Sequence, residues 1–202
     1  MKRINIIDDL FTEEEQMILN DEIEIMQYMW GGAKKRQAWV KQPQRNAWQF
    51  WSSVIYPTAG SKANATLVTV EELYKTYPVI MDAWDKISAT LSDNYNLHKY
   101  EFSKIYTLAQ FNSSDASDIH QDIGDLSILY YSKPNWNIEW DGGTIFYNDE
   151  ITDCVEYVPY KSGRTVVFDA KIPHKGMSVS PKATELRTIL AFKLRLKENG
   201  SN

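Results

Sequence analysis

The stretch Arg164-Thr165-Val166-Val167-Phe168 has the composition of a short buried β-strand, because β-branched and aromatic residues dominate it. It is one of six such runs after residue 99, the others being Lys104–Phe111, Leu126–Ser132, Thr144–Asn148, Cys154–Val158 and Leu186–Leu196. Turn-forming residues separate the runs, as in Asp141-Gly142-Gly143 and Lys161-Ser162-Gly163. Short strands at this spacing, with no helix between them, favour an antiparallel sandwich or jelly roll over an α/β sheet.

The first third of the chain has a helical pattern instead. Thr12 and Glu15 have the spacing of a capping box, in which each side chain bonds the other residue's free backbone N–H. A second helix is predicted from Val70 or Glu71 to about Leu91. Pro78 is a point where that helix can divide, since proline lacks a backbone N–H. The predicted fold class is therefore mainly β with N-terminal helices.

No repeat, low-complexity block or linker divides the 202 residues. The hydrophobic fraction of 43% and the charged fraction of 24% are close to the average of globular proteins. We therefore predict a single domain over residues 1–202, with residues 1–98 as a helical support region and residues 99–197 as the jelly-roll core.

Charge and cysteine content exclude several classes of protein. The chain has 22 Lys and Arg against 27 Asp and Glu, a net charge of −5 that disfavours a nucleic-acid partner. The lone Cys154 excludes an internal disulfide framework and a multi-cysteine zinc site, and it points to a reducing compartment. Asp8 and Asp9 interrupt the only N-terminal run that resembles a targeting signal. We therefore expect a cytoplasmic protein with no membrane segment.

His120-Gln121-Asp122 is the most informative triplet in the chain. On an extended backbone, residues i and i+2 project to the same face, so one imidazole and one carboxylate can chelate one ion. His174, directly after Pro173, is a suitable third ligand. Two imidazoles and one carboxylate form the facial triad of non-haem Fe(II) sites, which leaves coordination positions open. The alternative is an ordinary surface histidine, because a bare H-x-D also occurs by chance.

Arg187 lies in the apolar run Leu186-Arg187-Thr188-Ile189-Leu190-Ala191-Phe192. A guanidinium in such a strand needs a partner, and a carboxylate bound through two parallel hydrogen bonds is the natural one. That carboxylate can belong to a ligand or, as the alternative, to an Asp or Glu in a core salt bridge.

Taken together, these stretches resemble the double-stranded β-helix, or jelly-roll, core of Fe(II)- and 2-oxoglutarate-dependent dioxygenases. Within them the resemblance is to the prolyl 4-hydroxylase-like group. It covers residues 120–194, 75 of the 202, and the helical part fits only in general layout. The matching stretches, in order, are His120-Gln121-Asp122, Ile128-Leu129-Tyr130-Tyr131, Trp140-Asp141-Gly142-Gly143, Gly163-Arg164-Thr165-Val166-Val167-Phe168-Asp169, Ile172-Pro173-His174 and Leu186–Phe192.

The resemblance implies a role for each matching residue. His120, Asp122 and His174 would be the catalytic metal ligands for Fe(II), and Arg187 would bind the distal carboxylate of 2-oxoglutarate. Tyr131 matches a strand position whose hydroxyl also reaches that carboxylate, although a plain aromatic core residue is the alternative. The implied reaction consumes O2 and 2-oxoglutarate, releases succinate and CO2, and hydroxylates an unactivated C–H bond. Ascorbate is a candidate reductant.

Two departures from the family pattern stand out. Many relatives have Gly-Gly-Glu-Thr where this chain has Gly142-Gly143-Thr144-Ile145, so a cosubstrate role is not carried over to Thr144. His174 and Arg187 are 13 residues apart, longer than is usual, which predicts an enlarged turn around residues 181–184.

The substrate stays open at this level. A peptidyl proline and a free small molecule are both compatible with the resemblance. A nucleic-acid demethylase is the first alternative, although those enzymes typically carry a second Arg where this chain has Lys193. A non-catalytic jelly-roll binding module is the second. The tryptophans and cations of residues 30–56 could form a binding groove, but burial of the tryptophans against the core is the simpler interpretation. The oligomeric state is undetermined.

Overall fold

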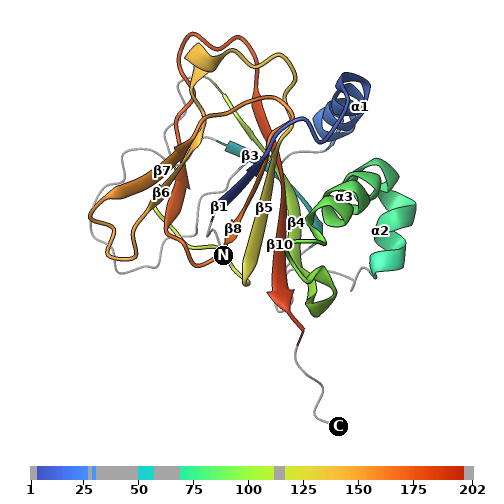
Figure 1. Cartoon of the computed structure of the whole chain (residues 1–202). Coiled ribbons are helices and arrows are strands. Elements are labelled where there is room, and N and C mark those ends of the chain that lie inside the picture. Colours follow the sequence, from blue (N-terminus) through green and yellow to red (C-terminus); the bar gives the residue numbers. More distant parts are fainter. Residues whose placement is uncertain (1–3, 27–28, 31–49, 57–68, 112–116, 198–202) are drawn as a thin grey trace.

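Two antiparallel sheets and three helices make up the described part of the chain in the computed structural model, which covers residues 4–26, 29–30, 50–56, 69–111 and 117–197 (Figure 1). The major sheet has the strand order β1-β8-β5-β10-β4-β3-β2, and the minor sheet has the order β7-β6-β9. The predicted fold class, mainly β with N-terminal helices and a jelly-roll core, is confirmed.

The strands are β1 (Ile4–Ile7), β2 (Met29–Trp30), β3 (Phe50–Tyr56), β4 (Tyr100–Gln110), β5 (Leu126–Tyr131), β6 (Thr144–Tyr147), β7 (Cys154–Val158), β8 (Thr165–Asp169), β9 (His174–Gly176) and β10 (Arg187–Leu196). The helices are α1 (Glu13–Glu24), α2 (Val70–Thr76) and α3 (Pro78–Leu91), with two short 3-10 turns, η1 (Leu97–Lys99) and η2 (Ile138–Trp140). All six predicted runs after residue 99 are strands.

Residues 1–98 contribute strands as well as helices. β1, β2 and β3 all join the major sheet, so residues 1–98, expected as a helical support region, also supply three strands of that sheet. β1 pairs with β8, where Ile4 lies opposite Phe168 and Ile7 opposite Thr165. The four residues of β1 are too few to show a clear hydrophobic alternation. The strand forms because β8 offers a free edge for pairing. The division of the chain into one domain stays a prediction.

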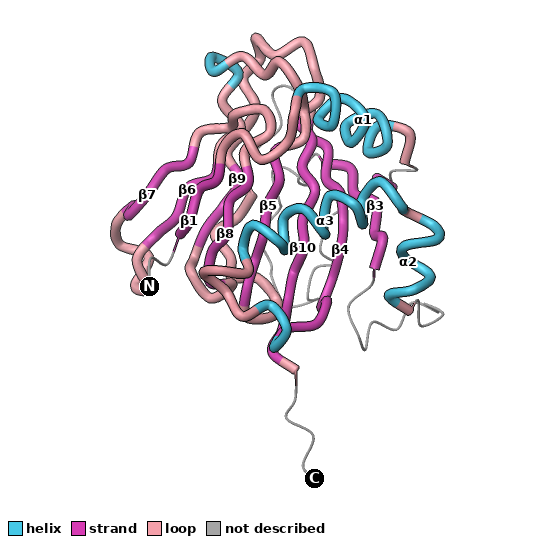
Figure 2. The backbone as a smooth tube through the Cα atoms, turned by 45° about the vertical axis from the view of Figure 1, so that its right-hand side comes forward, coloured by secondary structure: helices cyan, strands magenta, loops and turns pink. Residues whose placement is uncertain are grey.

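The three helices cover one face of the major sheet (Figure 2). Ile80 and Ile87 of α3 are fully buried there, in one cluster with Leu190 and Phe192 of β10. Both α1 and α2 begin at a complete capping box, and the box predicted at Thr12 and Glu15 is confirmed. The predicted division at Pro78 is also confirmed, because that proline opens α3. No helix in the described ranges is long and apolar enough to cross a membrane.

The other face of the major sheet meets the minor sheet in a second apolar cluster. Side chains alternate along β10, so Leu190 and Phe192 face the helices while Ile189 and Ala191 face the second cluster. Arg187 and Lys193 share the face of Ile189 and Ala191, which we call the inner face. The candidate site lies on this inner face.

Candidate functional site

His120 and His174 lie opposite each other across an isolated antiparallel bridge. The backbone N–H of each residue donates to the carbonyl of the other, both at 2.9 Å. This pairing brings the two imidazole rings together, with 4.5 Å between their centroids. One ring therefore comes from β9 and the other from the segment between β4 and β5, 54 residues earlier in the sequence.

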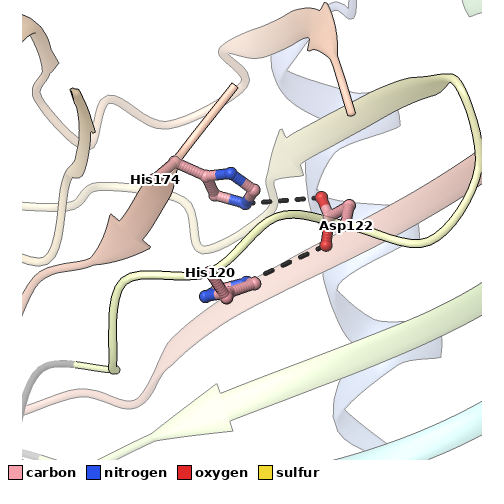
Figure 3. Close-up of side chains that lie close together, drawn as sticks. All are labelled: His120, Asp122 and His174. Carbon is pink, nitrogen blue, oxygen red and sulfur yellow. Dashed lines mark ion pairs between the residues drawn. The ribbon is translucent and has the colours of Figure 1, made fainter. Parts of the chain in front are cut away.

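Asp122 completes the cluster (Figure 3). Its Oδ1 is 3.8 Å from Nε2 of His120, and its Oδ2 is 3.3 Å from Nε2 of His174. One ligand atom from each of the three residues lies within 4.8 Å of the others, close enough to share one metal ion. The structure thus brings together the three residues named from the sequence. Their role as metal ligands stays a prediction.

Backbone carbonyls orient both rings. Nδ1 of His120 is 2.8 Å from the carbonyl oxygen of Asp118, and Nδ1 of His174 is 2.8 Å from that of Ile172. A carbonyl can only accept, so each Nδ1 carries the hydrogen and each neutral ring keeps its Nε2 lone pair free for a metal. Burial lowers the pKa of His120, which favours this neutral form. The donor set therefore fits a divalent metal ion.

Lys193 is the residue that sequence reasoning missed at this site. The residue is 3% exposed, and its Nζ donates to Oδ2 of Asp122, which also accepts from Ser127 at 2.7 Å. Burial alone would raise the pKa of Asp122, but the charge of Lys193 and the hydrogen bond that Lys193 donates hold it well below its usual range. Asp122 is therefore ionised, with Oδ2 held by the protein. The only signal in the sequence was a lysine between Phe192 and Leu194 in an apolar strand.

Arg187 is 2% exposed on the inner face. Its Nε donates to the carbonyl of Gly142, and its Nη1 donates to Oε1 of Gln110 at 2.7 Å. Among the described residues no carboxylate lies within ion-pair distance of it, and the ionisable groups acting on its pKa are tyrosines. The alternative of a core salt bridge thus has no partner in this part of the chain. A buried guanidinium with two neutral acceptors can take an anionic ligand.

The surroundings of Arg187 are aromatic and tight. Its guanidinium lies 5.4 Å from the ring centroid of Tyr160 and 5.9 Å from that of Tyr131, and the two rings stack at 4.5 Å. Tyr131 is fully buried, and its hydroxyl donates to Oγ1 of Thr144 at 2.7 Å. Gly142 has a φ of +81°, and a Cβ there would lie 2.8 Å from Cδ of Arg187, so a side chain has no room. Tyr131, Tyr160 and Gly142 therefore surround Arg187, and we call this region the arginine pocket.

The arginine pocket lies next to the histidine cluster. Gly176 and His174 are two residues apart on β9, about 7 Å along an extended strand, and project to the same face. The position of a Cβ at Gly176 is 3.9 Å from Nη2 of Arg187. The long connection between β9 and β10 runs beside residues 140–143, where Gly142 donates to the carbonyl of Ser178 at 3.1 Å. The long spacing between His174 and Arg187 therefore extends this paired loop. Arg187 stays close to the metal ligands.

Trp136 is buried and in edge-to-face contact with Trp140 at 5.0 Å. The tryptophan-rich and basic segment lies largely outside the described residues, which omit 31–49. The binding-groove interpretation of that segment stays a prediction.

No protein-family model matches the chain. No curated protein matches its sequence either. Solved structures do match. A Pseudomonas putida prolyl-4-hydroxylase is 14% identical with a TM-score of 0.63, covering 96% of this chain and 93% of that one. A Trichoplax adhaerens prolyl hydroxylase, in complex with a peptide of the hypoxia inducible factor oxygen degradation domain, is 15% identical with a TM-score of 0.62, covering 96% and 84%.

A third structure is HygX from Streptomyces hygroscopicus, with nickel and 2-oxoglutarate bound. It is 12% identical with a TM-score of 0.63, covering 96% of this chain and 83% of that one. A further structure of HygX also holds hygromycin B. At these identities the likeness establishes the fold, and this chain has the jelly-roll fold of the prolyl hydroxylase-like 2-oxoglutarate–Fe(II) oxygenases.

Proposed function

We propose that this chain is an Fe(II)- and 2-oxoglutarate-dependent dioxygenase of the prolyl 4-hydroxylase type. Its substrate is a peptidyl proline or a small molecule, hydroxylated at an unactivated C–H bond with release of succinate and CO2. One observation carries the proposal. A His-Asp-His cluster lies next to a buried arginine that has no carboxylate partner among the described residues, in an oxygenase fold.

Each residue has a defined task in this proposal. His120 and His174 present Nε2, and Asp122 presents Oδ1, because Ser127 and Lys193 hold its other oxygen. Together with 2-oxoglutarate, an Fe(II) ion bound by these three atoms would supply the O2-activating chemistry of the reaction.

Arg187 anchors the far carboxylate of 2-oxoglutarate through a charge-assisted hydrogen bond. Gln110 and Gly142 fix the guanidinium before the ligand arrives, so little conformational freedom is lost on binding. The neighbouring tyrosines are buried, and burial raises the pKa of Tyr131, which keeps its hydroxyl a neutral donor. This end of the pocket matches the chemistry of a dicarboxylate.

The neighbours support both classes of substrate. One prolyl hydroxylase structure holds a peptide, and the HygX structure holds hygromycin B, a small molecule. The intact carboxylate at Asp122 supports hydroxylation, since related halogenases commonly have a small residue at this position. Ascorbate is proposed as the reductant that restores Fe(II) after uncoupled turnover.

Anaerobic titration with Fe(II) and then 2-oxoglutarate tests this proposal. The complex should show the weak visible charge-transfer band of an Fe(II)–2-oxoglutarate chelate, and admission of O2 should produce succinate. His174→Ala should lose the band, while Lys75→Met, at an exposed site on α2, should keep it. Absence of the band in the wild-type protein, or an undiminished band in His174→Ala, would contradict the proposal and favour a non-catalytic binding module.

A further inference from the structure

Two lysines near Asp122 carry more positive charge than the carboxylates of the described residues around them neutralise. Lys104 of β4 lies directly opposite Lys193 of β10 in the strand register. Lys104 shares the inner face with Tyr106, and its Nζ lies 4.5 Å from the centroid of that ring. Nζ of Lys193 lies 5.8 Å from the same ring. The two ammonium groups thus flank one tyrosine at the end of the inner face that holds Asp122.

Asp122 is the one carboxylate among the described residues that acts on both lysines. Lys193 donates to it directly, whereas Lys104 has no carboxylate within ion-pair distance in the described ranges. Burial lowers the pKa of Lys104, and the charge of Lys193 lowers it further. A partly buried ammonium group that contacts an aromatic ring but no carboxylate is suited to bind an anion.

Filling the site as proposed above does not neutralise the lysines. A divalent metal takes up the charge of Asp122, and the distal carboxylate of 2-oxoglutarate neutralises Arg187. Arg187, Lys193, Lys104 and the metal bring five positive charges, whereas Asp122 and 2-oxoglutarate bring three negative ones. Two positive charges remain in the site as a whole, whose most exposed metal ligand is His120.

The sequence also restricts where a counter-ion can come from. Between Glu24 and Glu71 the chain has six Lys or Arg and no Asp or Glu. Strand β3 lies within this stretch and pairs with β4, where Tyr56 is opposite Ile105, next to Lys104. In the segments outside the described residues, the sequence holds two acidic residues, Asp115 and Glu198. Residues 25–70, which include β3, therefore offer no carboxylate to Lys104.

We propose that the substrate of this site carries an anionic group, a carboxylate or a phosphate-like oxyanion, that binds against Lys104. The inference rests on the proposed function, since it places the substrate at the open end of a site already filled by metal and 2-oxoglutarate. It narrows the substrate class to acidic small molecules or to peptides with an anionic group near the reacting carbon. Lys193 pairs with Asp122, and Lys104 binds the anionic group of the substrate.

Two small anions test this without knowledge of the natural substrate. The protein is loaded anaerobically with Fe(II) and saturating 2-oxoglutarate, and acetate and sulfate are titrated in parallel, with acetamide as the neutral control. Calorimetry measures binding, and the charge-transfer band reports whether the anion lies close to the metal. At least one anion should bind saturably while acetamide does not. Stronger acetate binding indicates a carboxylate substrate, and stronger sulfate binding indicates a phosphate or sulfate ester.

Variants assign the binding to Lys104. Lys104→Met should weaken it about fivefold or more, and Lys104→Arg should keep most of it. Lys75→Met, at an exposed lysine on α2, should change nothing. Each variant is checked for an unchanged far-UV spectrum. Saturable binding of neither anion to the wild type, or equal affinity in Lys104→Met, overturns the proposal. Calorimetry measures anion binding whether or not the charge-transfer band is present. Absence of the band therefore contradicts the proposed function, whereas absence of anion binding contradicts the role of Lys104.

Discussion

At the scale of single residues, Arg187 makes the clearest prediction. Arg187→Met should weaken 2-oxoglutarate binding by about 2–4 kcal/mol, roughly 30- to 1000-fold, because a buried charge pair with the ligand is lost. The anaerobic 2-oxoglutarate titration measures this change. Metal affinity, followed with Mn(II) by electron paramagnetic resonance, should stay within about twofold because Arg187 is not a metal ligand.

The same variant should have an opposite effect on stability. Without ligand, Arg187 is a buried cation with neutral partners, so an apolar residue of similar length should leave the free energy of unfolding unchanged or raise it. Arg187→Lys, which keeps the charge but loses the fork of donors, should bind 2-oxoglutarate with intermediate affinity. A large loss of stability together with unchanged 2-oxoglutarate binding would show that Arg187 is a structural residue.

The residues of the site differ in how far the sequence reveals them. His120, Asp122, His174 and Arg187 stand out because charged or ligating groups in strand-like surroundings need a reason. The contact between Lys193 and Asp122 could not be predicted, because it joins residues 71 positions apart through a register that depends on the whole sheet. The hydrogen bond between the side chains of Tyr131 and Thr144 could not be predicted for the same reason.

At the scale of elements, the N-terminal cap of α1 makes a second prediction. The hydroxyl of Thr12 accepts from the backbone N–H of Glu15 at 3.2 Å, and Glu15 accepts from the N–H of Thr12 at 2.7 Å. Thr12→Ala should lower the free energy of unfolding by about 1 kcal/mol, measured by urea denaturation. Thr12→Ser keeps the acceptor and should lose much less. Equal losses in the two variants would mean that the methyl group, not the hydroxyl, matters.

The attachment of β1 makes a third prediction, which concerns pH. Asp8 follows β1 and accepts from Nε and Nη2 of Arg164 at 2.8 and 2.9 Å, and this pair lowers the pKa of Asp8 to about 2. The ionised form is therefore favoured in the folded state. Its contribution, about 1–2 kcal/mol, is complete above the unfolded pKa near 4 and is lost as the pH falls towards 2.

Asp8→Asn tests that dependence. Urea denaturation at pH 7 should show the variant less stable than the wild type by about 1–2 kcal/mol, and the difference should shrink towards zero near pH 2. Asp9→Asn is a matched control, because Asp9 is far more exposed and lies 3.6 Å from Lys161. A stability difference that stays constant across this pH range would show that Asp8 does not stabilise the fold through its charge.

The elements show where sequence reasoning ends. Six of the seven strands after residue 99, all except β9, were predictable because turn residues bound each run of β-branched and aromatic residues. Strands β1 and β9 were not, because no turn signal precedes β1 and the three residues of β9 include no β-branched or aromatic strand former. β1 is a strand through its pairing with β8, about 160 residues later, and β9 through pairing with β6. Long-range pairing of this kind leaves no local signal.

At the scale of the whole molecule, the two faces of the major sheet have separate roles. The helices cover one face with a continuous apolar cluster, and the other face holds the site against the minor sheet. β10 contributes to both, since Phe192 packs under the helices while Arg187 and Lys193 face the site. His174 belongs to the minor sheet and Arg187 to the major sheet. Ligands bound to both should therefore hold the two sheets together.

This arrangement predicts that ligands stabilise the folded chain in two separable steps. Mn(II), which occupies the site without turnover, should raise the thermal midpoint, and 2-oxoglutarate should raise it further only when metal is present. At a hundredfold excess over its Kd a ligand adds about 2.7 kcal/mol, which for a chain of this size corresponds to roughly 5–10 °C. Differential scanning calorimetry at fixed protein concentration measures both steps.

Two variants separate the steps because each removes one binding partner. His174→Ala should lose the metal step and, with it, the 2-oxoglutarate step. Arg187→Met should keep the metal step and lose most of the 2-oxoglutarate step, since the distal carboxylate then has no cation to bind. A metal step of equal size in His174→Ala would place the metal outside the cluster of His120, Asp122 and His174. A full 2-oxoglutarate step in Arg187→Met would place the dicarboxylate outside the arginine pocket, because a ligand stabilises the folded state only through the contacts it makes there.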